Sequence, residues 1–524
     1  MRRHWWWGVS LMCAAALAAT AGCSAARPQA MITAADGLAA SGGLSGSAVE
    51  VPGTAALNTG ADASVLSVSC ASAGNCAAGG YYSHEPGATI DFGIFPGVPQ
   101  GYEVAGAQPF VSSQAGGRWH GATRISFPAA LDAVGGWIQQ VSCAGPGDCS
   151  AGGTFADTSG QRQVFAVSEV HGTWGRATLI PGPAGSSNAS LTAMSCASPG
   201  NCSAGGDYQD SAGHRAMFVI SEVHGTWGAV RRITGIFATH AFGYQLPGLT
   251  SMSCASAGNC SAGGEFQIPS PKVHGAYVAE AFVISQAGGK WGTAIEVPGS
   301  AALNAGGNAQ VTAMSCRSSG NCSAGGTYWL KPGGPVGGSA FVVSEVHGTW
   351  GRARQAPGVA AIEKSQAGLS FAKVSALSCS SAGNCSVGGV VGTVSFVSSQ
   401  VRGTWHTASV LSPAASIGQV HLDLSALSCG SAGNCSAAGR YDVPKGAKGF
   451  GLFVARELNG RWSTASPVPG VTVLARHPSA VLPSLTCDPA GNCSGGGNYP
   501  DGKSTPIPHG DDPHLQAFVV TDQH

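Results

Sequence analysis

The chain has 524 residues, and its 26 Lys and Arg balance its 26 Asp and Glu. Charged residues make up only 10% of the sequence, against about 25% in typical proteins, and no basic stripe is present to neutralise phosphates, so nucleic acid is not an expected partner. Beyond the first residues, no apolar run is long enough to span a bilayer.

Residues 1–22 are typical of an export signal. The chain begins Met-Arg-Arg-His, an apolar run follows from Trp5 to Ala21, and small residues precede Cys23. The ending Ala-Gly-Cys resembles a bacterial lipobox, in which the cysteine becomes the lipidated N-terminus, although Thr20 stands where Leu is usual. We therefore expect lipid on Cys23, with plain secretion as the alternative. Cys13 is removed with the signal.

Residues 23–43 are rich in Ala, Ser and Gly, a composition typical of a flexible tether. With lipid on Cys23, this segment would hold residues 44–524 at the outer face of the cell membrane. The lipid anchor is the only membrane contact that we expect.

Sixteen of the eighteen cysteines form eight pairs, each with five residues between its partners. An alternating strand pattern precedes each pair, and residues such as Ala-Gly-Asn between the cysteines favour a tight hairpin. Facing cysteines in such a hairpin lie within disulfide reach, whereas zinc sites usually pair closer cysteines with a second pair or with His. We predict eight disulfides, which join Cys70 to Cys76, Cys143 to Cys149, Cys196 to Cys202, Cys254 to Cys260, Cys316 to Cys322, Cys379 to Cys385, Cys429 to Cys435 and Cys487 to Cys493.

Each cysteine hairpin starts a longer repeat. An apolar run such as 216–223 follows it, then a two-residue turn such as His-Gly, and then a Trp strand in seven copies. Four strands per repeat, called A to D, predict an all-β, eight-bladed β-propeller. The eighth repeat stops after strand C, but residues 46–58 match residues 292–304, which follow Trp291. The N-terminal segment is therefore predicted to complete the last blade and close the ring, whereas an open solenoid would need capping ends.

The two faces of such a propeller differ in their connections. The A–B and C–D turns are short and uniform, whereas the B–C and D–A connections vary, and variable loops on a rigid scaffold usually bind ligands. Aromatic residues in these loops form the candidate binding face, namely Tyr82, Phe92, Phe95, Tyr102, Tyr244, Tyr277 and Trp329.

Two sets of residues have side chains that can bind metal ions. His171, His224 and His347 recur at the C–D turn, but the equivalent residues are Gly116, Gly288, Arg402 and Asn459, so we expect turn residues. The run 509–514 contains His509, Asp511, Asp512 and His514, which is a candidate cation site. The simpler interpretation is a solvated, Pro-rich loop. No cofactor is expected.

The pattern Ser-Cys-(five residues)-Cys-x-Ala-Gly-Gly, followed by Gly-x-Trp, resembles the cysteine-hairpin repeats of exported actinobacterial proteins that are predicted propellers. The resemblance covers residues 46–521 and implies the architecture without an activity. The stretch 168–174 is faintly similar to the Asp-box of sialidase-type propellers but lacks its Asp. Eight Trp-bearing blades are also similar to those of quinone-dependent dehydrogenases, but this sequence lacks the Asp and the Thr-Gly before Trp of their blade motif.

We expect a binding or scaffold module for cell-envelope glycans or proteins. The alternative is a glycan hydrolase or lyase at the channel mouth, which requires converging carboxylates. The candidates for these lie on or beside variable loops, at Glu85, Asp91, Glu265 and Glu280.

Overall fold

The computed structural model describes residues 46–84, 106–131, 133–235, 248–270, 277–331, 337–366, 371–443, 449–475, 479–507 and 510–521. Residues Gly42–His524 form one compact unit, which contains every described strand and all eight disulfides. Within the described residues, no helix has both the length and the apolar character needed to cross a bilayer. Residues 1–45, with Cys13 and Cys23, lie outside the described part, so the export signal and the lipid site stay predictions.

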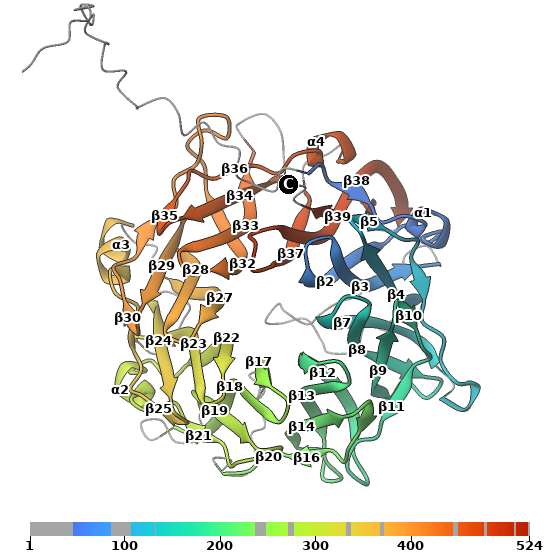
Figure 1. The fold of residues 1–524 in the computed structure, drawn as a ribbon, viewed down its shortest axis with the longest axis horizontal. Coiled ribbons are helices and arrows are strands. Elements are labelled where there is room, and N and C mark those ends of the chain that lie inside the picture. Colours follow the sequence, from blue (N-terminus) through green and yellow to red (C-terminus); the bar gives the residue numbers. More distant parts are fainter. Residues whose placement is uncertain are drawn as a thin grey trace, which may run out of the picture. The chain divides into compact units, whose positions relative to one another are not determined.

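Eight antiparallel sheets are arranged as blades around a central axis (Figure 1). The innermost strands A are β2 (Ala63–Ser72), β7 (Ala133–Gly145), β12 (Ser187–Ser198), β17 (Gly248–Ser256), β22 (Ala309–Ser318), β27 (Ala372–Ser381), β32 (Leu422–Ser431) and β37 (Val481–Cys487). Strands B are β3 (Asn75–Ser83), β8 (Asp148–Asp157), β13 (Asn201–Gln209), β18 (Asn259–Pro269), β23 (Asn321–Trp329), β28 (Asn384–Val391), β33 (Asn434–Asp442) and β38 (Cys493–Ile507). Strands C are β4 (Ala107–Ala115), β9 (Arg162–Val170), β14 (Arg215–Val223), β19 (Tyr277–Ala287), β24 (Gly338–Val346), β29 (Val394–Val401), β34 (Phe450–Leu458) and β39 (Gly510–Thr521).

Strand D consists of two short pieces in blades 1 to 7. The first pieces, which carry the Trp, are β5 (Arg118–Trp119), β10 (Thr173–Trp174), β15 (Thr226–Trp227), β20 (Lys290–Trp291), β25 (Thr349–Trp350), β30 (Thr404–Trp405) and β35 (Arg461–Trp462). The second pieces are β6 (Thr123–Arg124), β11 (Thr178–Ile180), β16 (Arg231–Arg232), β21 (Ile295–Glu296), β26 (Arg354–Gln355), β31 (Ser409–Val410) and β36 (Ser466–Pro467). Short helices follow some blades, at η1 (Ala129–Leu131), α1 (Thr54–Leu57), α2 (Ser300–Leu303), α3 (Val359–Ser365) and α4 (Val471–Leu474).

The N-terminal segment closes the ring as predicted. Strand β1 (Val49–Glu50) pairs antiparallel with β39, with Val49 opposite Val519. It thereby takes the place in blade 8 that β21 takes in blade 4. Trp119 Nε1 of blade 1 donates to Thr521 Oγ1 of blade 8 at 3.1 Å, the bond that Trp174, Trp291 and Trp350 make to a serine of their preceding blades. The predicted eight-bladed, strand-complemented propeller is therefore confirmed.

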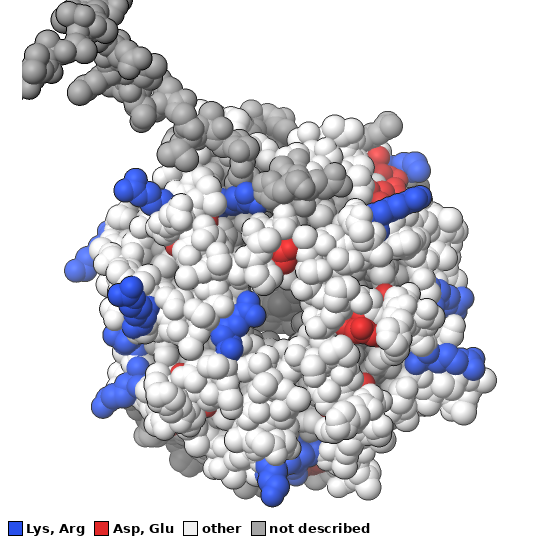
Figure 2. Space-filling model, in the orientation of Figure 1, with Lys and Arg blue, Asp and Glu red and all other residues white. Residues whose placement is uncertain are grey.

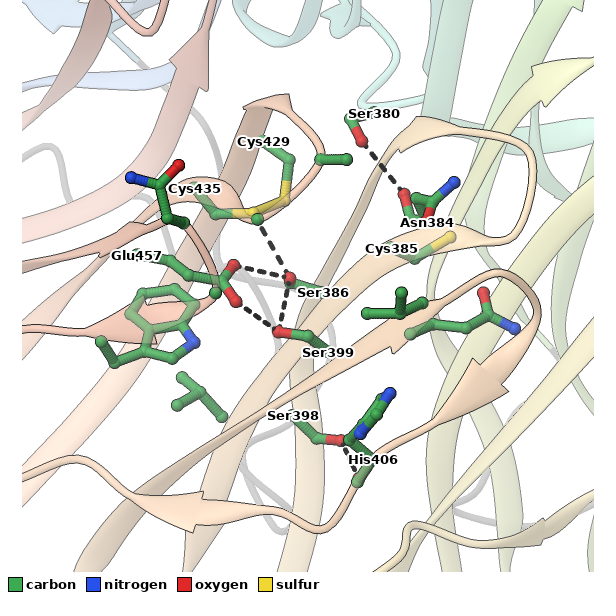
Figure 3. A pocket seen from close by; sticks show the side chains of 18 of the residues that line it. Ser380, Asn384, Cys385, Ser386, Ser398, Ser399, His406, Cys429, Cys435 and Glu457 are labelled. Carbon is green, nitrogen blue, oxygen red and sulfur yellow. Dashed lines mark hydrogen bonds between the residues drawn. A yellow bond between two sulfur atoms is a disulfide. The ribbon is translucent and has the colours of Figure 1, made fainter. Parts of the chain in front are cut away.

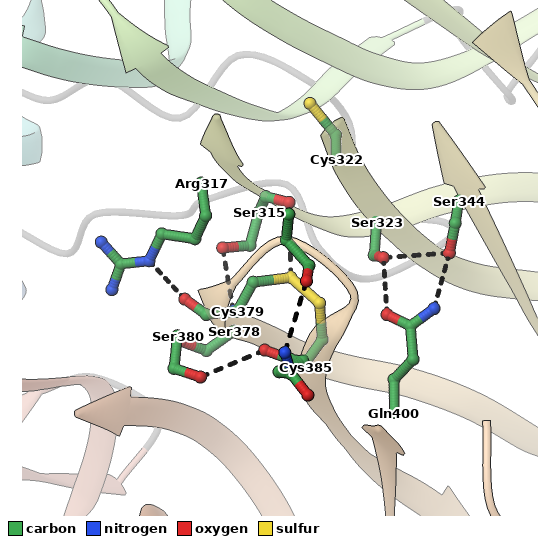
Figure 4. The surroundings of a disulfide bond; sticks show 12 residues. Ser315, Arg317, Cys322, Ser323, Ser344, Ser378, Cys379, Ser380, Cys385 and Gln400 are labelled. Carbon is green, nitrogen blue, oxygen red and sulfur yellow. Dashed lines mark hydrogen bonds between the residues drawn. A yellow bond between two sulfur atoms is a disulfide. The ribbon is translucent and has the colours of Figure 1, made fainter. Parts of the chain in front are cut away.

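All eight predicted disulfides are formed. Each staples an A–B hairpin, as at Cys379 and Cys385 (Figure 4). The Cys379 backbone N–H donates to the hydroxyl of Ser315 in the preceding blade at 3.0 Å. The same bond from the first cysteine of one blade to a serine of the preceding blade recurs at six other interfaces, so a belt of hydrogen bonds joins the inner strands.

The A–B and C–D turns lie on one face of the ring, which we call the disulfide face. In blade 6 the Gly403 N–H donates to the Gly383 carbonyl at 2.8 Å, and Asn384 Oδ1 accepts from the Arg402 N–H. The first residue of the C–D turn has a φ near +50° even where it is His, Arg or Asn, as expected for a type I′ hairpin turn. The repeated histidines thus occupy the predicted turn positions.

The cores lie between the blades. The largest fully buried side chains include one Phe from seven of the eight strands C, and Phe218 of the eighth, β14, is 3% exposed; the seven are Phe110, Phe165, Phe282, Phe341, Phe396, Phe453 and Phe518. The Gly-Gly of strand B lets neighbouring blades approach. A Cβ on Gly79 would lie 2.5 Å from Ile138 Cγ2 of the next blade, and one on Gly80 would lie 1.8 Å from the Ser64 carbonyl oxygen.

Candidate functional site

A buried carboxylate or carboxamide recurs on strand C, two residues before the C–D turn. It faces the preceding blade, and its exposure is 4% or less in all seven described copies, which are Gln114, Glu169, Glu222, Gln286, Glu345, Gln400 and Glu457. Both glutamate and glutamine occur at this position, so the shared requirement is a planar group that accepts hydrogen bonds.

Glu457 of blade 7 shows the geometry most fully (Figure 3). Its Oε2 accepts from the hydroxyl of Ser386 at 3.1 Å, and its Oε1 accepts from the hydroxyl of Ser399 at 2.6 Å. Both serines belong to blade 6, on β28 and β29. The Ser386 oxygen also lies 3.3 Å from Cys435 Sγ, so the interface joins carboxylate, hydroxyls and disulfide. The polar groups at this interface therefore form their hydrogen bonds with one another across the two blades.

The interfaces of blades 4 and 5 and of blades 5 and 6 repeat this arrangement. Glu345 accepts from Ser261 at 3.2 Å and from Ser285 at 2.9 Å. Where the residue is Gln400, its Oε1 accepts from Ser323 at 3.2 Å and its Nε2 donates to Ser344 at 3.1 Å. The amide therefore replaces the carboxylate because a serine hydroxyl both donates and accepts.

Burial changes the acidity of these carboxyl groups. It raises the pKa of Glu169, Glu222 and Glu345, and hydrogen bonds from the serines oppose that shift in each case. Desolvation disfavours the charged form, while a donated hydrogen bond favours it. Each of these carboxyl groups is thus held away from water by its neighbours.

Among the described residues, three of the interfaces open into clefts on the disulfide face above these groups. The clefts lie between blades 6 and 7, 4 and 5, and 5 and 6, with volumes of about 420, 360 and 220 Å³. We call them clefts 6/7, 4/5 and 5/6. Each is lined by a disulfide, serine hydroxyls, a strand C carboxylate or carboxamide, and the residues of A–B and C–D turns.

Cleft 6/7 offers additional polar groups near its opening. Its lining includes Asn384, Asn459, His406 and Thr407, and the last three are exposed. The indole N–H of Trp462 is buried without a hydrogen-bond partner among the described residues, whereas the equivalent N–H of Trp350 donates to Ser285 at 3.2 Å. Neutral donors and acceptors therefore surround this cleft, while its carboxylate lies at the floor.

The predicted aromatic face is only partly described. Tyr82 is 3% exposed and packs in the core of blade 1, because β3 continues through Ser83, so it cannot stack on a surface ligand. Tyr277 at the start of β19 is 39% exposed, and Trp329 at the end of β23 is partly buried. Phe92, Phe95, Tyr102 and Tyr244 lie outside the described residues.

The candidate catalytic carboxylates do not converge where they are described. Glu265 is opposite Ala281 in the β18–β19 pair, so the neighbouring Glu280 projects from the other face of the same blade. Burial raises the pKa of Glu265 to about 7 and also raises that of Glu280, which is 6% exposed. Glu85 and Asp91 lie outside the described residues.

The candidate cation site lies only partly within the described residues. His514 Nδ1 lies 2.8 Å from Asp501 Oδ2, a contact between β39 and β38. Asp511 and Asp512 lie on β39 opposite residues of β38, and His509 is outside the described residues. In the described part of the chain, no three metal-ligating side chains lie close enough together to hold an ion.

The sequence did not reveal the clefts. Their signal is present as the Ser-Glu or Ser-Gln pair before the C–D turns of blades 1 to 6, replaced by Arg456-Glu457 in blade 7, together with the serine that follows the second cysteine in most copies. The Glu or Gln of one repeat and the serines of the preceding repeat form each site together, and only the packing of the blades brings them into contact.

No protein-family model matches the sequence, and no curated protein does. Among solved structures, a Hadza microbial sialidase, Hz136, is 10% identical with a TM-score of 0.36, covering 70% of this chain and 68% of that one. A six-bladed fucose-binding lectin from Aleuria aurantia is 14% identical with a TM-score of 0.32, covering 63% and 95%. A protein of unknown function from Dyadobacter fermentans is 11% identical with a TM-score of 0.36, covering 73% and 93%. At these values the likenesses carry no functional argument.

Proposed function

We propose that this chain is an exported, membrane-tethered β-propeller that binds cell-envelope glycans through the clefts of its disulfide face. The observation that carries the proposal is the repetition of one set of groups at clefts 4/5, 5/6 and 6/7. A polymer with a repeating unit can engage several equivalent clefts at once, and such multivalency raises the overall affinity without new contacts.

The chemistry of the clefts favours a neutral, hydroxyl-rich ligand. Around cleft 6/7 the exposed groups are an amide, a hydroxyl and an imidazole, which donate and accept hydrogen bonds. Small-molecule sites usually have volumes of about 300–1,000 Å³. Clefts 6/7 and 4/5, at about 420 and 360 Å³, lie in this range and suit a small sugar unit, whereas cleft 5/6, at about 220 Å³, is smaller.

Binding is better supported than hydrolysis. Glycosidases need two carboxyl groups about 5–10 Å apart that both face the substrate. In cleft 6/7 the carboxylate among the lining residues is Glu457, which is 1% exposed and already accepts from two serines. A carboxylate bound in this way stabilises the interface and does not reach a substrate.

Eight disulfides agree with an oxidising compartment, and therefore with export. We propose that Cys23 carries the lipid and that residues 24–43 form the tether. Mass spectrometry of the mature protein tests this part, since a diacylglyceryl group on Cys23 is expected and a free thiol there would contradict it.

Capture of glycans tests the binding proposal. Residues 24–524 would be immobilised and incubated with polysaccharide and protein fractions of the cell envelope, with reduced and alkylated protein as the unfolded control. Ala432 is exposed at the edge of cleft 6/7, and Ala73 occupies the same turn position in blade 1 but lines none of the three clefts. We expect Ala432→Trp to weaken glycan capture and Ala73→Trp to leave it unchanged. Equal capture by both variants would contradict the assignment to the clefts.

A further inference from the structure

Every described C–D turn carries one exposed cationic or histidine side chain. It stands at the first turn position in blades 2, 3, 5 and 6, and directly after the turn in blades 1, 4 and 7. The residues are His171, His224, His347 and Arg402 in the first group, and Arg118, Lys290 and Arg461 in the second. Where the first turn position is Gly or Asn, a Lys or Arg stands two residues later, so each of blades 1 to 7 has one basic or histidine side chain here.

Aliphatic side chains stand beside these groups. In five blades the residue before the turn is among the most exposed large hydrophobic residues of the described chain, with 45% to 57% exposure, namely Val170, Val223, Val346, Val401 and Leu458. These basic, histidine and aliphatic side chains, which recur at the C–D turns around the disulfide face, form what we call the C–D rim.

Acidic groups are scarce on the same face. Among residues between paired cysteines or in the described C–D turns, the acids are Asp148 and Asp488. Asp488 is 4% exposed, and Asp148 Oδ1 accepts from the His171 N–H at 3.1 Å. The face turned to the viewer in Figure 2 shows Lys and Arg mostly around its outer edge, with one group beside the central opening, and fewer acidic side chains.

The rim is rigid because the turns hold one another. In each of blades 1 to 7 a glycine N–H of the C–D turn donates to a glycine carbonyl of the A–B turn, at 2.8 to 3.0 Å. The backbone positions of these four basic and three histidine residues are therefore fixed on one face, and little backbone freedom is lost when they bind a flat partner.

The chain enters the fold at this same face. Strand C runs toward the C–D turns, so Thr521 at the end of β39 lies near the disulfide face. Because β1 is antiparallel to β39, the residues before Val49 lie at that end. Gly46 is packed against Thr521, where an added Cβ would meet the Thr521 carbonyl oxygen. Gly46, the first described residue, thus lies at the disulfide face.

We propose that the disulfide face lies against the membrane and contacts anionic phospholipid headgroups through the C–D rim. This inference rests on the proposed export and tether. Basic side chains near an anionic bilayer are attracted to it, and apolar side chains beside them enter the interface. The proposed tether joins the propeller at this face and would keep the effective concentration of the rim at the membrane high. The rim therefore needs only weak affinity for the headgroups. The clefts would then face glycans attached to the membrane or lying next to it.

Vesicle co-sedimentation tests the proposal. The protein would be residues 24–524 without lipid, and the probes would be phosphatidylcholine vesicles with and without phosphatidylglycerol. The rim variant replaces each cation by the residue that other blades have at that position, as Arg118→Thr, Lys290→Thr, Arg402→Asn and Arg461→Thr. The control variant removes four exposed charges elsewhere, as Arg232→Gln, Lys331→Gln, Lys364→Gln and Lys503→Gln.

We expect wild type and the control variant to bind the vesicles that contain phosphatidylglycerol and not the vesicles of phosphatidylcholine only. The partition coefficient of the rim variant on the anionic vesicles should be at least about tenfold lower than that of wild type. Equal binding by the rim variant and wild type, or equal loss in the control variant, would overturn the proposal. Retention on a soluble polyanion without vesicle binding would also overturn it, in favour of a polymer ligand. Glycan capture by the rim variant, measured separately, should equal that of wild type, so failure of the membrane contact is distinguishable from failure of the glycan proposal.

Discussion

Glu457 accepts a 2.6 Å hydrogen bond from Ser399 of the neighbouring blade while remaining 1% exposed. The pair joins strand C of blade 7 to strand C of blade 6. A buried carboxylate is costly unless it is hydrogen-bonded, and here the neighbouring blade supplies the donors. The polar interface therefore holds the blades in register as well as forming the floor of cleft 6/7.

Substitution of Glu345 tests this role for the strand C position. Glu345→Gln should fold with nearly unchanged stability, because Gln286 and Gln400 already serve at equivalent positions. Glu345→Ala removes the acceptor of Ser261 and Ser285 and should lower the free energy of unfolding by about 1–3 kcal/mol. Chemical denaturation of both variants provides the measurement. Equal losses in the two would show that charge, and not hydrogen bonding, is required.

Removal of a single disulfide tests the stapling of the hairpins. Replacing both Cys379 and Cys385 by Ala opens one short loop and should lower stability by about 2 kcal/mol on the chain-entropy model. Thermal unfolding of the double variant, compared with wild type under non-reducing conditions, measures the effect. A variant as stable as wild type would mean that the belt of hydrogen bonds alone holds the hairpin.

Deletion of the closing strand tests the ring. A chain that begins at Gly53 lacks β1, so β39 has an unpaired edge in blade 8. Open strand edges pair with other chains, so this variant should melt at a lower temperature and self-associate, whereas a chain that begins at residue 44 should stay unchanged. Light scattering coupled to size-exclusion chromatography distinguishes the two. A stable monomer without β1 would contradict the closure.

The pH dependence of stability tests the environment of Glu265. Burial raises the pKa of its carboxyl group from 4.5 to about 7. Between these values the folded protein binds more protons than the unfolded chain, so the free energy of unfolding falls as pH rises from about 4.5 to about 7 and then levels. Glu265→Gln removes this dependence. The variant should therefore gain stability relative to wild type at pH 8 but not at pH 4, and a gain that is equal at both values would contradict the assignment.

The architecture followed from the sequence because its determinants are local and repeated. The cysteine spacing predicts the hairpins, and the match between 46–58 and 292–304 predicts β1. Tyr82 was placed in a loop wrongly, because sequence pattern alone does not show that β3 extends through Ser83. The clefts depend on contacts such as Ser386 with Glu457, which are 71 residues apart. No local pattern encodes that distance, since it arises from the rotation between blades.

The stoichiometry of glycan binding tests the central claim most directly. Isothermal titration of residues 24–524 with a short, purified fragment of the captured glycan gives the number of equivalent sites per chain. Binding at repeated clefts predicts more than one fragment per propeller, and fewer sites in Ala432→Trp than in Ala73→Trp. A single site per chain, unaffected by Ala432→Trp, would contradict the account and favour one site at the channel mouth.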